Sequence, residues 1–255
     1  MSNYTLKPYQ STNYVWLFFG IFFLVVTIGT VYVLAVLVPE DANLPKSTYA
    51  IVLLFLAITG YSFFKVKQQN GLSKINLTTE GLTYNDTNKS VLWKNISDLY
   101  LFSTGKVLGL ANNLAYRTSE NEPFTHISAM QYDIDGLEKI QEFYINPRVT
   151  EVLGMLNNGK TVTFHYIPLS NSLKQSFNIS ESQFLNIKTE SILLNNKEIT
   201  VTNKTYALTE LSVIGLNNSG DYQLKTQAGE VILEFNRMNL MSAEVFRNVI
   251  NQLVK

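Results

Sequence analysis

The residue types that carry acid–base or metal chemistry are few in this chain and widely spaced. It has two histidines, His126 and His165, and no cysteine, so disulfides and thiolate metal sites are excluded. Neither histidine is followed by His, Asp or Glu at the i+2 or i+4 spacing of a metal site, which usually recruits several ligands. Glu122 lies four residues before His126, but Pro123 disfavours a helix that would align them. We therefore expect no metal and no cofactor, and interpret both histidines as residues on strand faces.

The acidic pair Asp133 and Asp135 is the second candidate for chemistry. Paired carboxylates can exchange protons with a substrate or hold a cation through oxygen. The pair also precedes a helical pattern, where Asp133 can cap the helix and Asp135 can complement its dipole. We favour the capping role. The sequence contains no P-loop, G-x-G-x-x-G, G-x-S-x-G or H-E-x-x-H motif, so we predict a protein that is not an enzyme and has no catalytic residues.

The strongest pattern in the chain is a pair of uncharged apolar runs near its start. No charged residue lies between Lys7 and Glu40, and a second charge-free run precedes Lys65. A membrane-spanning helix needs about 20 apolar residues, and a flanking lysine can extend a shorter one. The first run is longer than the apolar region of a cleaved signal peptide, which is the alternative. The sequence therefore predicts a transmembrane hairpin with spans at about 14–38 and 47–64.

Basic residues beside the two spans predict their orientation. Lys7 precedes the first span, and Lys65, Lys67 and Lys74 follow the second, whereas the loop 39–46 holds two acids and one lysine. Because Lys and Arg favour the cytoplasmic side, we expect a multi-pass protein of a bacterial inner membrane with both termini in the cytoplasm. The 20 basic and 20 acidic residues give zero net charge, and no basic stripe points to a nucleic-acid partner.

Beyond residue 68 the chain changes to short alternating segments separated by Asn, Asp, Gly and Thr, which predict a β-rich region. Two amphipathic helices interrupt this pattern. One is Pro147–Leu156, with Asn146 as N-cap and a weaker helical pattern over 134–144 before it; the other ends the chain, with Asn239 or Ser242 as cap. The expected strands are 74–79, 82–85, 90–94, 98–102, 106–110, 114–118, 161–167, 184–188, 199–202, 205–208, 211–216, 222–226 and 231–235.

The chain also contains an internal repeat. Residues 87–101 align without a gap with residues 202–216, and the apolar positions agree at Val91/Tyr206, Trp93/Leu208, Ile96/Leu211 and Leu99/Ile214. Each copy is preceded by a short strand and followed by one of the two helices. Two related modules explain this pattern, and the alternative is chance similarity within a chain rich in Asn and Thr.

The first copy of the repeat resembles a known family. Its turn Glu80-Gly81-Leu82, followed by the spaced residues Val91, Trp93, Ile96 and Leu99, is similar to the opening of bacterial pleckstrin-homology-like (PH-like) domains. The resemblance covers about 72–157 and, more faintly, 176–254, where Leu208 replaces the tryptophan. It implies an antiparallel barrel or sandwich closed by a C-terminal amphipathic helix, often placed after two transmembrane helices. Trp93 would then lie in the core.

Together these observations predict an α+β chain of three parts: a transmembrane hairpin (1–68), a first PH-like module (69–158) and a second one (159–255). Phosphoinositide recognition is not favoured, because a polybasic site needs roughly 4–8 clustered basic residues. The turn 85–89 holds only Lys89, beside Asp86.

We expect a non-catalytic binding or scaffold protein that presents its modules in the cytoplasm to a protein or lipid partner, through strand edges or the cleft between modules. One alternative is an immunity protein against a toxin at the membrane. Another is an envelope-lipid enzyme with an unrecognised site.

Overall fold

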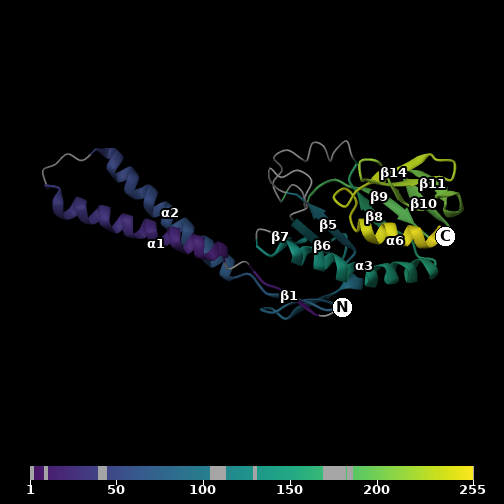
Figure 1. Cartoon of the computed structure of the whole chain (residues 1–255), viewed down its shortest axis with the longest axis horizontal. Coiled ribbons are helices and arrows are strands. Elements are labelled where there is room, and N and C mark those ends of the chain that lie inside the picture. The colour runs from purple at the N-terminus through teal and green to yellow at the C-terminus, as the bar shows by residue number, and fades with distance from the viewer. Residues whose placement is uncertain are drawn as a thin grey trace. The chain divides into compact units, whose positions relative to one another are not determined.

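The computed structural model describes residues 3–8, 11–39, 45–103, 113–128, 131–168, 182 and 186–254 (Figure 1). Its contacts divide the chain into two compact units. One comprises Met1–Leu6 together with Ile75–Lys255, and we call it the β-rich unit. The other, Lys7–Lys74, is the helical unit. The helical unit is thus inserted into the sequence of the β-rich unit.

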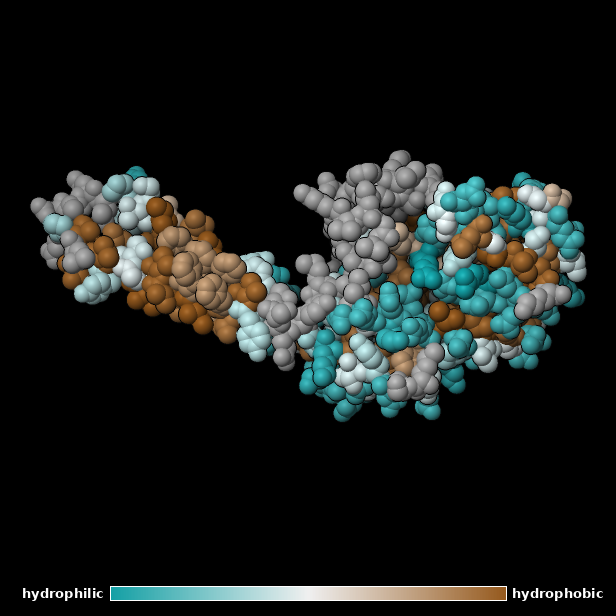
Figure 2. Space-filling view, in the orientation of Figure 1, coloured by the Kyte–Doolittle hydropathy of each residue, from teal (hydrophilic) through white to brown (hydrophobic). Residues whose placement is uncertain are grey.

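Two antiparallel helices form the helical unit. They are α1 (Ser11–Tyr32), which continues as the π-helical turn η1 (Val33–Leu37), and α2 (Lys46–Asn70). Both are long and apolar enough to cross a membrane, and only 11% of the most apolar stretch of each is buried. Figure 2 shows apolar side chains gathered on the surface of this unit, the distribution that lipid rather than water solvates. The expected spans 14–38 and 47–64 coincide closely with these helices.

The two helices approach each other at Gly20. A Cβ atom there would lie 3.3 Å from the ring of Phe63, so a larger residue would push the helices apart. Trp16 packs edge-on against Tyr61 with 5.6 Å between ring centroids. Near the ends that lead to the β-rich unit, Asn13 donates a hydrogen bond of 2.6 Å to Asn70. Helix packing and this amide pair hold the hairpin together.

The first half of the β-rich unit consists of two antiparallel sheets and a helix. The first sheet has the order β1-β2-β3-β4, and its first strand lies before the helical unit in the sequence, with Leu6 of β1 opposite Ile75 of β2. The second sheet has the order β5-β6-β7, and α3 follows it. The bounds are β1 (Tyr4–Leu6), β2 (Ile75–Leu77), β3 (Gly81–Tyr84), β4 (Lys89–Leu92), β5 (Asp98–Phe102), β6 (Asn113–Arg117), β7 (Thr125–Ser128) and α3 (Ile134–Asn157).

The second half has the same order of elements. A sheet of order β11-β10-β9-β8 is followed by a sheet of order β12-β13-β14 and by α6 (Figure 1). The bounds are β8 (Val162–Tyr166), β9 (Glu190–Leu194), β10 (Glu198–Val201), β11 (Lys204–Ala207), β12 (Gly215–Leu216), β13 (Tyr222–Lys225), β14 (Val231–Phe235) and α6 (Ala243–Leu253).

The two aligned sequence segments adopt the same local structure. In each, a turn with positive φ leads through a strand into a 3-10 turn, η2 (Trp93–Asn95) or η3 (Leu208–Glu210). The Trp93 amide donates to Glu80 at 3.0 Å, and the Leu208 amide donates to Lys197 at 2.8 Å. The repeated pattern in the sequence therefore corresponds to a repeated turn–strand–turn unit in space.

The fold is a mixed α+β structure with small antiparallel sheets, as expected. Within the described residues each of the four sheets is open, and none closes into the barrel that the resemblance implied. Trp93 is fully buried, in agreement with its predicted core position. In the second half, Phe246 of α6 packs edge-on against Phe164 and Phe235, with ring centroids 5.1 and 5.4 Å apart, so the apolar stripe of α6 covers the sheets.

The helix prediction around Pro147 was wrong in one respect. We expected a helix starting at Pro147 with Asn146 as its cap, but α3 is continuous from Ile134 and contains Pro147 in its interior. A proline there removes one backbone hydrogen bond, yet Tyr144 and Val149 on either side of it are buried. Burial on both sides of the proline therefore outweighs the local break.

The cap of α3 was predicted correctly, whereas some of the predicted strands differ from those in the structure. Asp133 does cap α3: its carboxylate accepts a hydrogen bond of 3.3 Å from the Asp135 amide. Of the expected strand 211–216 only Gly215–Leu216 is a strand, and the strands β1, β7 and β9 were not expected. The expected strand 106–110 lies outside the described residues, as do residues 184–185 of the expected strand 184–188; its described residues 186–188 are not a strand.

Candidate functional site

The two histidines occupy different environments. His126 lies on β7, where its Nε2 is 2.9 Å from Asn113 Oδ1 and its ring lies 5.5 Å from that of Phe102. His165 lies on β8, as the strand interpretation expected, but it is buried and takes part in a polar network that sequence reasoning did not predict. The network connects the two halves of the β-rich unit.

Asp98 is the centre of this network. It opens β5 and is almost completely buried, with Oδ2 accepting a hydrogen bond of 2.6 Å from Arg117 Nε and Oδ1 lying 3.0 Å from His165 Nδ1. Arg117 is its direct partner across the β5–β6 ladder, whereas His165 comes from the second half. Burial alone would raise the pKa of the Asp98 carboxyl, but hydrogen bonds from His165 and Arg117 hold it below its ordinary value. The carboxylate is therefore kept ionised.

The outer side of His165 faces a second carboxylate. Its Nε2 lies 3.4 Å from Glu120 Oε1, and Arg117 donates from Nη1 to the Glu120 backbone carbonyl at 2.9 Å. A hydrolytic triad would place a nucleophilic hydroxyl at this nitrogen. In this structure the imidazole instead lies between two carboxylates, Asp98 of the first half and Glu120.

A single segment, Asn239–Ser242, covers two sheet edges beside this network. The Ile167 amide, which follows β8, donates to Asn239 at 2.7 Å, and the Met241 amide donates to His165 of β8 at 2.9 Å. The Ser242 amide then donates to Leu99 of β5 at 2.7 Å. The segment therefore satisfies the edges of β5 and β8 at once and joins the two halves.

Ser242 is the most constrained residue of that segment. Its φ of 55° lies in the left-handed region, which costs a residue other than glycine roughly 1–2 kcal/mol. It occupies the predicted cap position of α6, yet its hydroxyl makes no capping bond. Instead the hydroxyl oxygen accepts from the Leu99 amide at 3.1 Å and lies 2.7 Å from the Tyr144 hydroxyl. Burial raises the pKa of Tyr144 to about 12, so the phenol stays protonated.

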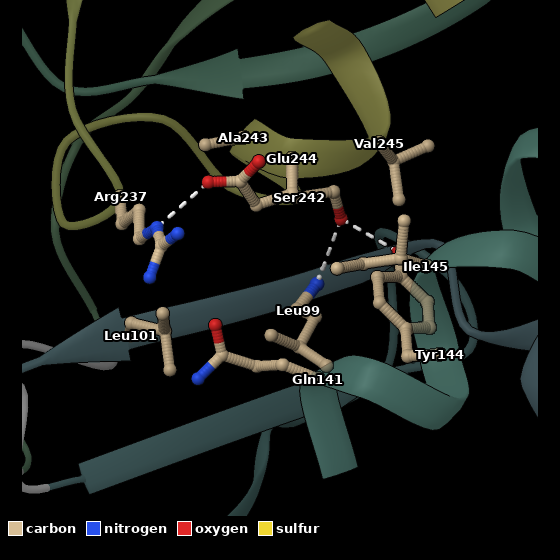
Figure 3. Close-up of a pocket in the computed structure, with 10 residues that line it drawn as sticks. All are labelled: Leu99, Leu101, Gln141, Tyr144, Ile145, Arg237, Ser242, Ala243, Glu244 and Val245. Atoms are coloured by element: carbon tan, nitrogen blue, oxygen red, sulfur yellow. Dashed lines mark hydrogen bonds and ion pairs between the residues drawn. The ribbon is translucent and has the colours of Figure 1, made fainter. Parts of the chain in front are cut away.

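A small cleft opens directly beside Ser242, and we call it the junction cleft (Figure 3). Residues from α3 and β5 form one wall, and residues at the start of α6 with Arg237 form the other. Figure 3 shows these side chains facing a common space. The lining residues are Leu99, Leu101, Gln141, Tyr144, Ile145, Arg237, Ser242, Ala243, Glu244 and Val245.

The rim of the junction cleft carries one carboxylate, Glu244, paired with two guanidinium groups. Glu244 Oε1 accepts from Arg237 Nε at 2.7 Å and from the Tyr222 hydroxyl at 2.9 Å, and its Oε2 pairs with Arg247 at 3.0 Å. The Arg237 side chain is more than half exposed, whereas that of Glu244 is buried. Two guanidinium groups thus surround one buried carboxylate, which leaves one net positive charge, and the exposed Arg237 can turn donors towards solvent.

The lining of the junction cleft combines apolar and polar groups. Its floor is apolar, with Leu99, Leu101 and Ile145, and its rim offers the Gln141 amide and the Arg237 guanidinium. An apolar group with one polar end fits such a lining. Among the described residues, no group of three or more His, Cys, Asp or Glu side chains is placed to hold a metal ion. Asp133 and Asp135 lie at the start of α3 as a helix cap.

Sequence reasoning missed Asp98, Arg117, Tyr144 and Ser242 as site residues. One signal was present: Asp98 and Arg117 are charged residues at the ends of otherwise apolar strands, which is unusual for fully buried segments. Nothing in the spacing shows that His165, 67 residues beyond Asp98, completes the network.

Comparisons with known proteins found no match to a protein-family model, to a curated protein or to a solved structure. The architecture itself defines a class: a chain with two helices long and apolar enough to cross a membrane, inserted into a mixed α+β unit of small antiparallel sheets.

Proposed function

We propose that this chain is a membrane-anchored, non-catalytic binding or scaffold protein that presents two PH-like modules to a protein partner. The observation that carries the proposal is the pairing of β1 with β2. Leu6 precedes the first helix of the hairpin and Ile75 follows the second, and the two residues are opposite each other in one sheet. A unit attached at both ends of a membrane hairpin is held at the bilayer, which raises its effective concentration for a membrane partner.

The same pairing supports the proposed topology. If the two helices cross a membrane, β1 and β2 have to lie on the same side of it, because they share hydrogen bonds. The lysines Lys7, Lys65, Lys67 and Lys74 flank the hairpin on that side. We therefore assign the β-rich unit and both termini to the cytoplasmic face of a bacterial inner membrane.

The PH-like assignment draws on the internal repeat. Each half has a four-stranded sheet, a 3-10 turn, a three-stranded sheet and a helix, in that order. The sequence resemblance lies in the strand and turn that contain Trp93, and the corresponding turn of the second half contains Leu208. This repetition favours two modules of one kind, at 69–158 and 159–255, with β1 added to the first.

We place the partner surface at the junction cleft. Asn239–Ser242 already bonds the edge of β5 at Leu99 and the end of β8 at His165, so an added strand could not use those positions. The cleft lies between the halves and combines an apolar floor with the Gln141 amide and the exposed Arg237 guanidinium. A protein segment carrying an apolar side chain next to a carboxylate or carbonyl matches that chemistry, because Arg237 supplies donors only.

The test compares two glutamine-to-arginine variants of the tagged full-length chain. Gln141→Arg fills the cleft with a long side chain, whereas Gln252→Arg makes the same change on an exposed position near the end of α6. Each protein is purified from membranes in mild detergent, and bound proteins are identified by mass spectrometry. We expect one protein to bind the parent and Gln252→Arg, and to be lost with Gln141→Arg.

The proposal fails if no protein is retained by the parent above an untagged control, or if Gln141→Arg retains the same set. A toxin among the cleft-dependent partners would make the chain an immunity protein. If a lipid and no protein is retained in this cleft-dependent way, the partner is a lipid and not a protein.

A further inference from the structure

The strand β1 connects the hairpin physically to the interior of the β-rich unit. It is the edge strand of its sheet and has three residues, joined to α1 by the short segment 7–10. Leu6 is fully buried and rests against Gly136 in the first turn of α3. A Cβ atom at Gly136 would overlap Leu6 Cδ1, so the absence of a side chain there is what admits Leu6.

The helix that receives Leu6 also builds one wall of the junction cleft. Gln141, Tyr144 and Ile145 lie one to three turns beyond Gly136 on the same helix. A helix rises by 1.5 Å per residue, so Tyr144 lies about 12 Å along the axis from the Leu6 contact. A shift of the first turn of α3 is transmitted along this length, because a helix moves as a rigid rod more readily than it bends.

At the far end of this path the Tyr144 hydroxyl meets Ser242, whose backbone lies in a region that costs energy for a residue other than glycine. Ser242 has left-handed backbone angles, and its hydroxyl is held between Tyr144 and the Leu99 amide. Serine ordinarily prefers right-handed or extended angles. When Tyr144 withdraws, Ser242 loses this hydrogen bond and keeps those to Leu99, which weakens the hold on the wall formed by Ala243, Glu244 and Val245.

We propose that the hairpin regulates the junction cleft through β1 and α3: displacement of α1 pulls Leu6 away from Gly136, shifts α3, and opens the cleft at Ser242. The edge position and small size of β1 make it the element most easily displaced, whereas β2 is held on both sides by β1 and β3. This regulation goes beyond the proposed partner role, and its test requires no partner.

The test uses the cysteine-free chain, in which Ser242→Cys provides a single thiol. The full-length protein is reconstituted in thin and in thick phosphatidylcholine bilayers, because a change in hydrocarbon thickness tilts membrane helices. The rate of maleimide labelling at position 242 reports how often the cleft opens. We expect the two rates to differ by roughly fivefold or more, the size of a modest allosteric coupling.

Two further proteins separate the proposed path from a general loosening of the fold. A flexible Gly/Ser insert of about eight residues after Lys7 breaks the link between α1 and β1, and should make the two labelling rates equal. Gly136→Ala, added to Ser242→Cys, should give fast labelling in both bilayers. Gly154→Ala is the matched control, because nothing lies within 4 Å of a Cβ atom at that position of the same helix.

Equal labelling rates in thin and thick bilayers for the chain without the insert would overturn the proposal. A thickness dependence that survives the insert would overturn it as well, because the signal would then bypass β1. Hydrogen–deuterium exchange of residues 237–245 in the unsubstituted chain provides the same comparison if Ser242→Cys does not fold. Binding of a partner at the cleft is measured separately with Gln141→Arg, so either idea can fail without the other.

Discussion

Replacement of Gly136 by alanine tests the packing of β1 most directly, and Gly154→Ala is its matched control. Both glycines lie in α3, where alanine is favoured over glycine by about 0.5–1 kcal/mol through backbone entropy. At Gly154 a Cβ atom meets nothing within 4 Å, so we expect that full gain in the free energy of unfolding. At Gly136 the new methyl group overlaps Leu6 Cδ1 and lies 3.1 Å from Leu6 Cγ.

The cost at Gly136 follows from what Leu6 can do. Overpacking of a core costs roughly 1–3 kcal/mol, and expulsion of a leucine from the core costs about 1.5–3 kcal/mol. Either cost exceeds the gain in helix propensity. We therefore expect the free energy of unfolding of Gly136→Ala to be about 1–3 kcal/mol lower than that of Gly154→Ala, although the chemical change is the same.

Urea titration of the full-length protein in detergent micelles measures this difference. The chain has two tryptophans, so a Trp16→Phe background leaves the buried Trp93 as the only indole reporter of the β-rich unit. In a Leu6→Ala background the penalty at Gly136 should disappear, which is the signature of a direct contact in a double-mutant cycle. Equal stability of the two alanine variants would show that Leu6 does not pack against Gly136.

Three further predictions concern strand pairing, the buried carboxylate and topology. Thr5→Cys with Asn76→Cys should form a disulfide within one chain, because directly paired strand residues have Cα atoms about 4.5–5.5 Å apart, within disulfide range; a dimer on a non-reducing gel would contradict the pairing. Asp98→Asn should cost about 3–5 kcal/mol in urea titrations at pH 7, because it removes the carboxylate that pairs with the mostly buried Arg117 guanidinium. Since the folded pKa of Asp98 is lowered, its ionised form stabilises the fold above the unfolded pKa of about 3.9, and this contribution is lost as the pH falls through the folded value. The stability gap between the parent and Asp98→Asn should therefore shrink in titrations below about pH 4, and a gap independent of pH would show that the carboxylate is not stabilised by its partners. A reporter enzyme fused after Lys255 should be active only in the cytoplasm, and activity in the periplasm would reverse the proposed orientation.

Features that depend on local sequence were predictable from it. The charge-free runs specify the two long apolar helices, because each run by itself supplies the apolar residues that a membrane-spanning helix needs. The aligned residues 87–101 and 202–216 have the same turn and strand structure, because the spacing of Trp93 and Leu208 from their turns is the same. The Asp133 cap is likewise a contact between near neighbours.

Features that depend on contacts between distant residues were not predictable. The strand β1 has only three residues, and its partner β2 begins at Ile75, so no local pattern identifies it. Asp98, Arg117 and His165 become a network only when two sheets meet. The helix break expected at Pro147 failed for the same reason, because burial against distant elements overrides a local preference.

The position of β1 has a consequence for how the protein is made. The strand β1 is synthesised before its partner β2, and the whole of Lys7–Lys74 has to be synthesised between Leu6 and Ile75. At a translation rate of about 5–20 residues per second, the strand waits for several seconds without its partner. If both helices insert into a membrane during that interval, β1 has to stay on the side where β2 will follow, because the two strands pair. Under the proposed topology, closure of the first sheet therefore marks chains whose two helices have been inserted as a hairpin.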